Sequence, residues 1–318
     1  MKFLKKNIQT EEFSYIWKRD RKNKKMKATV VGGSGFIGSH VCDHLSHAGY
    51  DVVIYDQIES PWLKPKQKII IGDLMDLDLL GEAIKGAEIV FNFAAISDLN
   101  QARDKPIDTV KINILGNLHV LETCRLNNVK RFIYASTVYV YSREGGFYRC
   151  SKQSAEQYVE EYQKRYGLNY TILRFGSLYG PRSDSKNGLY RIVKEALQSG
   201  RILYAGSSDA IREYIHVDDA ASACVKIIDK EYINQSIVLT GQEPMRVSDL
   251  LKMLAEILGK SDCVDFVEER YEGHYVKTPY AYISKIGKKF VPSFHVDLGQ
   301  GLLQLINEVQ SKLNYEDS

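Results

Sequence analysis

The stretch VVGGSGFIGSH, residues 30–40, decides the fold of this chain. Its glycines fit two spacings, because Gly33, Gly35 and Gly38 form GxGxxG while Gly32, Gly35 and Gly38 form GxxGxxG. An apolar β-branched pair precedes the glycines and another apolar pair follows them, which predicts a turn from a strand into a helix. The main chain can approach a pyrophosphate closely at such a turn, and the helix N-terminus favours the negative charge. Glycine also occurs in tight turns for conformational reasons alone, so the rest of the sequence has to decide.

Short apolar runs rich in β-branched residues alternate with helical stretches through the first half of the chain. This alternation predicts an α/β fold with a Rossmann-type doubly wound parallel sheet, because parallel neighbours need crossover connections. After YGPRSDSKNG the alternation becomes irregular, and we expect a smaller C-terminal substrate-binding lobe. The predicted strands are residues 28–31, 52–55, 69–71, 89–93, 131–135 and 170–174, and the predicted helices of the lobe are 189–199, 220–228, 247–258 and 298–313.

Composition and charge exclude several classes of protein. The chain has 318 residues, 44% of them hydrophobic and 26% charged, with a net charge of +3. Residues 1–27 hold ten Lys and Arg against three Asp and Glu, so the remaining body carries a charge of −4. We therefore expect a basic N-terminal extension and no nucleic-acid surface on the body. No apolar run approaches the ~20 residues of a membrane span, so no membrane partner is expected.

The cysteines indicate a reducing compartment. Their number is odd, their spacing is wide, and no CxxC pair occurs, which predicts neither a disulfide framework nor a zinc site. We therefore expect a cytoplasmic protein without a metal. The five residues are Cys42, Cys124, Cys150, Cys224 and Cys263.

The second predicted strand, DVVIYD, ends in Asp56, 18 residues after Gly38. A carboxylate at this place accepts hydrogen bonds from the adenosine ribose and repels a 2′-phosphate. The glycine turn and Asp56 together predict NAD rather than NADP as the cofactor.

A second group of residues suggests proton transfer. The segment YRCSK places Tyr148 and Lys152 four residues apart on one face of a helix. A phenol is a poor base at neutral pH, but a nearby ammonium and a positively charged nicotinamide favour its phenolate. The strand RFIYAS leads into Thr137, a hydroxyl at the carboxyl end of a strand, where open α/β sheets bind ligands.

In this order, the motifs resemble the extended short-chain dehydrogenase/reductase family, in its nucleotide-sugar, UDP-glucose 4-epimerase-like branch, over residues 27–310. GGSGFIG resembles the family's GxxGxxG and therefore includes Gly32. The family's adenine-site segment is resembled by GDLMD, the segment under its cofactor by FNFAA, and its Asn-x-x-Gly segment by NILGN. The stretch YASTVYVY puts Thr137 at the family's catalytic Ser/Thr position, and Tyr148 and Lys152 follow it. The cofactor contacts that the resemblance implies are Gly32, Gly35, Phe36, Ile37, Gly38, Asp56, Asp73, Leu74, Ala94, Ala95, Asn113, Tyr148 and Lys152.

The second lobe continues the resemblance. LRFGSLYGPR places Ser177 where many relatives have Asn, and IREYIHVDDAA places Arg212 where the family contacts the sugar-nucleotide diphosphate. Ser177, Arg212 and Thr137 are thus the expected substrate contacts. Asp219 is expected to cap a helix and His216 to be a core residue.

The sequence departs from the family at two places. Val138 and Tyr139 follow Thr137, whereas the sugar dehydratases of this family carry a Thr-Asp-Glu-like segment here. The carboxyl groups that elimination of water needs are therefore missing next to Thr137. Thr137 and Tyr148 are also only 11 positions apart, about half the family's usual separation. This shorter loop predicts more room beside the sugar, and hence an unusual or larger sugar such as a heptose. Cys150 lies between the catalytic pair and is expected to pack along the helix.

The resemblance implies NAD-dependent oxidation at C4 of a nucleotide-activated sugar. A 4-epimerase returns the hydride to the other face of the sugar, whereas a 4-dehydrogenase releases the 4-keto sugar, and the sequence barely separates the two. A non-catalytic NAD- or sugar-nucleotide-binding protein is the alternative from another class.

We divide the chain into residues 1–26, a basic extension, residues 27–177, an NAD-binding Rossmann domain, and residues 178–318, mainly a substrate-binding lobe. Residues 107–127 and 148–166 resemble the family's paired interface helices, which predicts a homodimer or a higher homo-oligomer.

Overall fold

The computed structural model describes residues 25–259, 263–267 and 274–279. The chain forms two compact units, Met1–Tyr282 and Ile283–Ser318, and every described residue lies in the first. The helix predicted at residues 298–313 and nearly all of the basic extension lie outside the described residues. None of the described helices has the length and hydrophobicity that crossing a bilayer requires.

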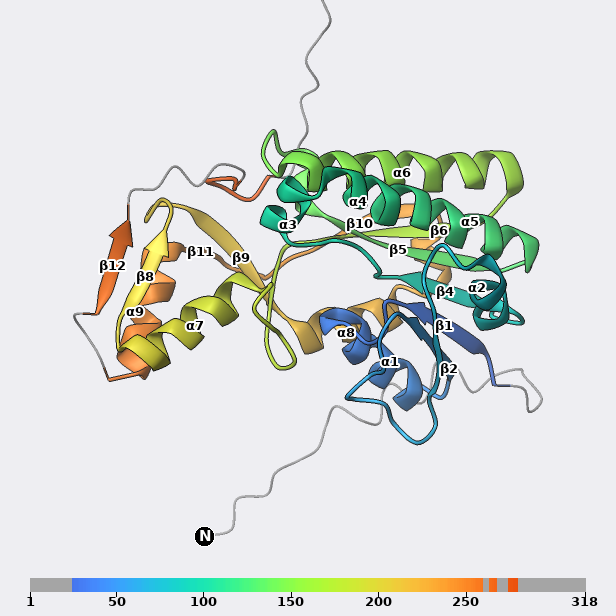
Figure 1. Cartoon of the computed structure of the whole chain (residues 1–318), viewed down its shortest axis with the longest axis horizontal. Coiled ribbons are helices and arrows are strands. Elements are labelled where there is room, and N and C mark those ends of the chain that lie inside the picture. Colours follow the sequence, from blue (N-terminus) through green and yellow to red (C-terminus); the bar gives the residue numbers. More distant parts are fainter. Residues whose placement is uncertain (1–24, 260–262, 268–273, 280–318) are drawn as a thin grey trace, which may run out of the picture. The chain divides into compact units, whose positions relative to one another are not determined.

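A seven-stranded parallel sheet organises the described chain (Figure 1), which confirms the predicted fold class. Its order is β10 (Gln235–Leu239), β6 (Tyr170–Phe175), β5 (Arg131–Thr137), β4 (Ile89–Asn92), β1 (Lys27–Val31), β2 (Asp51–Asp56) and β3 (Lys68–Ile71). The six predicted strands are present within a residue or two of their predicted ends. The seventh, β10, was not predicted.

Helices cover both faces of this sheet because its strands alternate their side chains between two cores. Val30 packs with α1 (Phe36–His47) and α8 (Val217–Lys226) on one face. Its neighbour Val31 packs on the other face with α2 (Leu77–Ile84), α5 (Asn117–Leu126) and α6 (Gly146–Tyr166). Between β4 and α5 the chain forms α3 (Leu99–Asp104), α4 (Pro106–Val110) and a π-helical turn, Lys111–Gly116. Figure 1 shows α1 and α8 on one side of the sheet and α5 and α6 on the other.

The remaining elements form smaller sheets beyond the carboxyl ends of the strands. β7 (Ser177–Tyr179), β9 (Ile211–His216) and β11 (Pro244–Arg246) make one sheet, and β8 (Ile202–Ala205) pairs with β12 (Val264–Val267) in another. The helices α7 (Gly188–Ser199) and α9 (Val247–Ile257) confirm two predicted helices and contribute to a separate small core.

Helix α8 begins three residues earlier than predicted, and this corrects two expectations. Its N-cap is His216, whose Nδ1 accepts the backbone N–H of Asp218 at 3.3 Å. Asp219 is therefore not the cap. It lies in the first turn of α8, where its negative charge interacts favourably with the helix dipole. His216 ends β9 and is only partly buried, so it is a capping residue and not a core residue.

Candidate active site

The glycine turn has the geometry that the GxxGxxG spacing predicts. Gly32 has φ +79°, and a Cβ on it would lie 2.5 Å from the backbone nitrogen of Ala94. A Cβ on Gly38 would lie 2.2 Å from the Gly32 carbonyl oxygen. Gly33 instead packs toward Ile54 in the core, so its role is structural. Helix α1 has no side-chain cap at Gly35, which leaves the N–H groups of its first turn available to an anion.

Asp56 ends β2 beside this turn, and Asp73 follows two residues after the end of β3. Asp56 Oδ2 accepts the backbone N–H of Ser34 at 2.9 Å, which ties the carboxylate to the glycine turn. Asp73 Oδ2 accepts Gln57 Nε2 at 2.9 Å, and Leu74 is buried beneath the segment. A dinucleotide such as NAD fits this arrangement. Side chains would block the glycine turn, the first turn of α1 has no side-chain cap, and Asp56 lies beside both.

The three predicted catalytic residues converge on one cavity of about 790 Å³. Thr137 ends β5, while Tyr148 and Lys152 lie in successive turns of α6, and all three are buried. The Thr137 hydroxyl acts on the Tyr148 phenol and lowers its pKa, and Lys152 Nζ donates to the Ala135 carbonyl at 2.7 Å. Gly32, Gly35, Phe36, Ile37, Gly38 and Ala95 line the same cavity. The sequence motifs thus predict residues that the fold does bring together.

Burial controls the protonation of the central pair. It raises the pKa of Tyr148 to about 12, and the Thr137 hydroxyl opposes the rise. It also lowers the pKa of Lys152 to about 7, against the opposing charge of Glu156. The sequence predicts that Lys152 lowers the pKa of Tyr148, whereas in this structure its ammonium lies 5.9 Å from the Tyr148 ring centroid and bonds the Ala135 carbonyl. Lys152 is therefore a group that changes its charge near neutral pH.

An ion-pair network that the sequence reasoning missed lies behind Lys152. Glu156 accepts hydrogen bonds from Ser136 Oγ at 2.5 Å and from Arg174 Nη2 at 2.6 Å, and Arg174 also bonds the Tyr141 hydroxyl. These residues join β5, β6 and α6 at the catalytic end of the sheet. The available signal was the position of Glu156, one helical turn after Lys152.

Asn113 lies behind the cavity wall and not on it. Its Oδ1 accepts the backbone N–H of Ile96 at 2.8 Å, and its Nδ2 donates to Ser151 Oγ at 2.9 Å. It thus braces the segment after β4 against α6, next to Lys152. Cys150, expected to pack along the helix, is instead exposed.

The predicted substrate contacts, Ser177 and Arg212, line the far side of the cavity. Both contact Tyr275, which the sequence analysis did not single out. The Ser177 hydroxyl lowers the pKa of Tyr275, and the Arg212 guanidinium lies 4.4 Å from the centroid of the Tyr275 ring. Arg212 Nη1 also donates to the Val276 carbonyl at 3.3 Å, so the chain itself orients the guanidinium.

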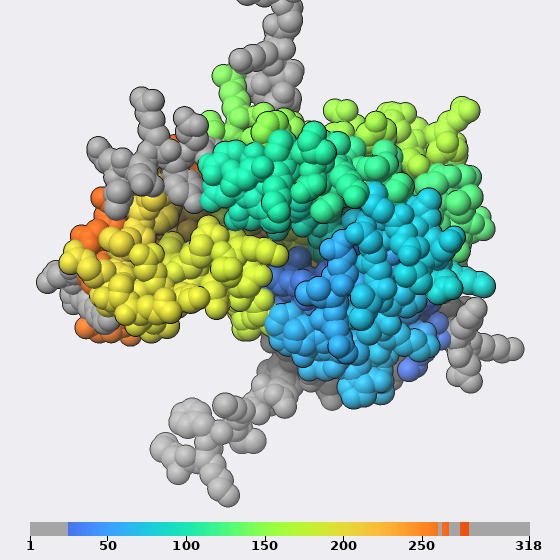
Figure 2. All heavy atoms as spheres, in the orientation of Figure 1, coloured from blue at the N-terminus to red at the C-terminus, as the bar shows by residue number. Residues whose placement is uncertain are grey.

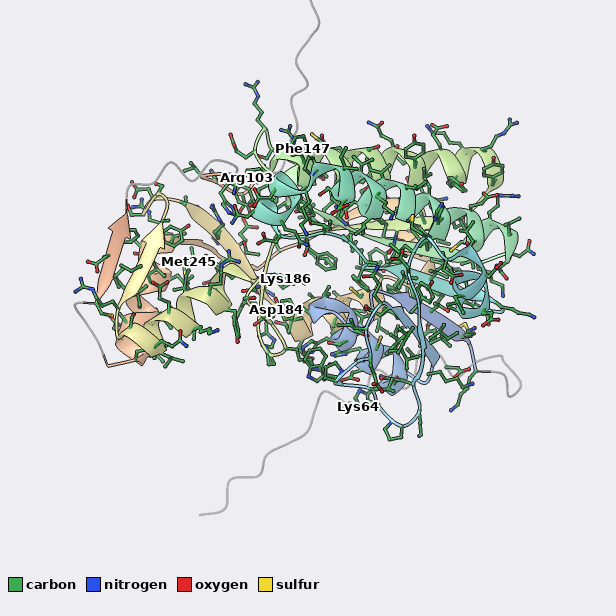
Figure 3. The ribbon with its side chains drawn as sticks, viewed as in Figure 1. Lys64, Arg103, Phe147, Asp184, Lys186 and Met245 are labelled. Atoms are coloured by element: carbon green, nitrogen blue, oxygen red, sulfur yellow. The ribbon has the colours of Figure 1, made fainter. Side chains whose placement is uncertain are left out.

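Charged residues from the segment between β7 and α7 complete the cavity. Asp184 and Lys186 lie in this segment (Figure 3), and Arg191 on α7 pairs with Asp98 at 3.5 Å. The surface is hollowed where the regions of α1, α3 and α7 meet (Figure 2).

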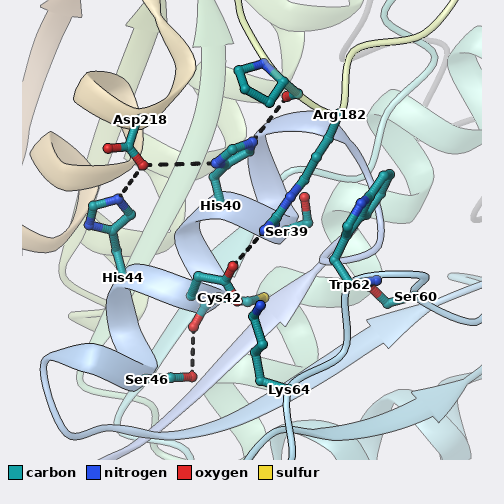
Figure 4. A network of polar contacts seen from close by, with 12 residues as sticks. Ser39, His40, Cys42, His44, Ser46, Ser60, Trp62, Lys64, Arg182 and Asp218 are labelled. Atoms are coloured by element: carbon teal, nitrogen blue, oxygen red, sulfur yellow. Dashed lines mark hydrogen bonds and ion pairs between the residues drawn. The ribbon is translucent and has the colours of Figure 1, made fainter.

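A polar network joins α1 to the substrate side of the cavity (Figure 4). Asp218 Oδ1 lies 2.8 Å from His44 Nε2 and 3.9 Å from His40 Nδ1, which connects α8 to α1. Arg182 Nη2 bonds Asp43 Oδ2 at 2.7 Å, which connects the segment after β7 to α1. The helix of the glycine turn and a wall of the cavity are thus held together.

Fold and site together define a dinucleotide-binding α/β enzyme with a Thr-Tyr-Lys group at the carboxyl ends of its strands. The model of the NAD dependent epimerase/dehydratase family matches residues 28–239, and the chain belongs to this family. NAD is the cofactor on which the enzymes of this family depend.

Among its relatives is a putative UDP-glucose 4-epimerase of Methanocaldococcus jannaschii, 29% identical over 72% of this chain and 82% of the relative. The crystal structure of Thermotoga maritima UDP-glucose 4-epimerase with UDP-glucose has a TM-score of 0.74 and 28% identity, over 81% of this chain and 90% of that one. Bacillus cereus UDP-glucuronic acid 4-epimerase, solved with UDP-glucuronic acid and NAD, has a TM-score of 0.73 and 27% identity, over 80% and 90%.

Proposed function

We propose that this enzyme oxidises C4 of a nucleotide-activated sugar and returns the hydride, as a nucleotide-sugar 4-epimerase. The observation that carries the proposal is one cavity lined by the glycine turn, by Thr137, Tyr148 and Lys152, and by Arg212. NAD, when bound, accepts the hydride from C4 and gives it back. The solved relatives with UDP-glucose and with UDP-glucuronic acid support a nucleotide sugar as substrate.

The chain's own residues supply binding and proton transfer. Tyr148 takes the proton of the C4 hydroxyl, and Thr137 hydrogen-bonds the same oxygen. Lys152 binds the nicotinamide ribose, and its positive charge there favours the Tyr148 phenolate. Asp56 accepts the adenosine ribose hydroxyls, and Asn113 acts only by holding the wall of the site. The groups around the cofactor are Gly32, Gly35, Phe36, Ile37, Gly38, Asp73, Leu74, Ala94 and Ala95.

The substrate side fits a diphosphate. The planar fork of Arg212 can donate two hydrogen bonds to phosphate oxygens, and Ser177 can add a third. Val138 and Tyr139 carry no carboxyl group, so elimination of water from the sugar is not part of the proposal.

The decisive experiment incubates the purified enzyme with UDP-, GDP-, CDP- and dTDP-sugars and identifies the products by mass spectrometry and NMR. A 4-epimerase gives a sugar of unchanged mass and inverted C4. Loss of two hydrogens indicates the 4-dehydrogenase. Loss of one water would contradict the interpretation of Val138 and Tyr139. Binding without turnover of any of these sugars would favour the non-catalytic alternative.

We also propose that the enzyme acts as a homodimer in the cytoplasm. Apolar side chains on α4, α5 and α6 support the dimer: Ile107, Val110, Leu126, Phe147 and Tyr158 are all more than a third exposed. An isologous pairing of these helices would cover them.

A further inference from the structure

Tyr139 and His274 form a pair on the wall of the catalytic cavity. The Tyr139 hydroxyl lies 2.6 Å from Nδ1 of His274, and both residues line the cavity. Tyr139 belongs to the 3₁₀ helix η3 (Val138–Tyr141), two residues after Thr137. Its ring stands edge-on to the ring of Tyr148, with centroids 6.3 Å apart. The pair therefore lies directly beside the group that is proposed to take the C4 proton.

Packing on both sides fixes the ring of Tyr139. A Cβ on Gly145 would lie 2.7 Å from its Cδ1, and the Tyr275 ring centroid lies 4.8 Å from its own. Gly145 belongs to the short loop before α6, from which the sequence predicts additional room. The structure instead places the Tyr139 ring against this loop, so an aromatic wall borders the cavity here.

Both members of the pair are neutral at physiological pH. Burial raises the pKa of Tyr139 well above its ordinary value. Burial, then the charges of Arg212 and Arg191, lower the pKa of His274 to about 4, although Asp98 opposes them. Moving a proton from a sugar carbon onto this pair would create a buried charge, which is costly. Hydrogen bonding is the chemistry that remains.

We propose that Tyr139 and His274 determine sugar specificity by hydrogen-bonding an uncharged sugar hydroxyl near C4, either the hydroxyl on C3 or the hydroxyl on C6, the carbon that C5 carries. The C4 oxygen has to reach Tyr148 and Thr137 together, and the adjacent wall then faces the substituents at C3 or C5. This inference rests on the proposed function, because it needs a sugar whose C4 lies at Tyr148.

The test pairs a conservative substitution with altered sugars. Tyr139→Phe removes one hydroxyl, and Tyr190→Phe on α7 removes an exposed hydroxyl outside the cavity lining as a matched control. Each is measured with UDP-glucose and with its 3-deoxy and 6-deoxy analogues. The values of kcat and KM are measured in the otherwise unsubstituted enzyme. The affinity for each sugar is measured by calorimetry with NAD-loaded protein that also carries Tyr148→Phe.

Tyr139→Phe is expected to weaken UDP-glucose binding about 5- to 50-fold and to act mainly on KM, because the bound sugar hydroxyl loses the hydrogen bond of the Tyr139 hydroxyl. That loss should disappear with the deoxy analogue that lacks the contacted hydroxyl, and His274→Asn should show the same dependence. Equal losses with all three sugars, a loss below twofold, or a change in kcat alone would overturn the inference. If none of the UDP-, GDP-, CDP- and dTDP-sugars binds the unsubstituted enzyme, the proposed function fails and the inference fails with it. If another of these sugars is the substrate, the same test uses that sugar and its deoxy analogues.

Discussion

Lys152 shows what burial does to a single charged side chain. Its ammonium is almost fully enclosed, and its pKa falls from 10.5 to about 7. Between these pH values the unfolded chain binds more protons than the folded chain, so the stability of the folded chain rises with pH across this range. The stability cost of the buried ammonium is fully present below pH 7.

Lys152→Met removes this titration. The stability of the variant relative to the unsubstituted chain should be greatest near pH 6 and should decline as the pH rises toward 10. Thermal unfolding of protein stripped of NAD, followed by circular dichroism across this range, measures the difference. Lys194→Met, at an exposed position of α7, should show no such trend. A pH-independent difference for Lys152→Met would mean that Lys152 titrates alike in both states.

Tyr148→Phe tests proton transfer directly. The variant loses one hydroxyl and no charge, so kcat should fall about 10²- to 10⁴-fold. NAD affinity, measured by fluorescence titration, should stay within threefold, and Tyr190→Phe on α7, at an exposed position outside the cavity lining, should be fully active. Activity of Tyr148→Phe close to that of the unsubstituted enzyme would reject the catalytic assignment.

Asp56→Asn separates charge from hydrogen bonding at the ribose site. The amide oxygen can still accept the Ser34 N–H, but the repulsion toward a 2′-phosphate is lost. The preference for NAD over NADP should therefore drop by at least roughly tenfold, as measured by competitive cofactor binding. Unchanged preference would show that another residue distinguishes the two cofactors.

Local motifs predicted residues that gather at one cavity, whereas contacts between distant segments were not predictable. Gly32, Thr137, Tyr148 and Lys152 stand in short patterns whose spacing carries the geometry. His274 meets Tyr139 across 135 positions, and no pattern in either segment indicates the contact.

We expect the glycine turn and α1 to position the cofactor. Gly38 lies so close to the Gly32 carbonyl that no side chain fits between them. Gly38→Ala should destabilise the fold by roughly 1–3 kcal/mol and weaken NAD binding, because the turn has to move. Urea unfolding and cofactor titration measure the two effects.

Gly81 supplies the contrasting case in α2. A Cβ on this residue would meet nothing within 4 Å. Gly81→Ala should therefore stabilise the chain by about 0.5–1 kcal/mol through helix propensity. If both alanine variants lost stability equally, the close approach at Gly38 would not be the cause.

Strands and helices were predictable where the sequence shows a clear apolar pattern. They were not predictable where a strand forms only because it pairs with a distant strand. The six predicted strands are apolar runs, mostly well buried in the sheet. β10 is only partly buried, and residues 235–239 form a strand because they pair with β6. Similarly, α8 begins at Val217 because the ring of His216 caps it, which no standard capping pattern indicates.

The whole enzyme is expected to pair through α4, α5 and α6. Ile107 is 78% exposed on α4, and Ile257 is 75% exposed on α9, outside the proposed interface. Ile107→Glu should shift the mass in solution from twice the chain mass toward 36.2 kDa, whereas Ile257→Glu should leave the dimer intact. Light scattering after gel filtration distinguishes the two masses. A monomeric unsubstituted enzyme at micromolar concentration would contradict the prediction.

The position of β10 limits how this protein can be rearranged. The chain leaves the main sheet after β6, builds the substrate side, and then returns to supply both an edge strand and the covering helix α8. The proposed division at residue 177 therefore separates expected functions, and it does not separate two units that fold independently. A fragment ending there would expose the edge of β6 and the apolar side of α1, a state prone to aggregation. A chimera that takes its substrate lobe from a relative would therefore fold only if residues 217–239 came from the same protein as the main sheet.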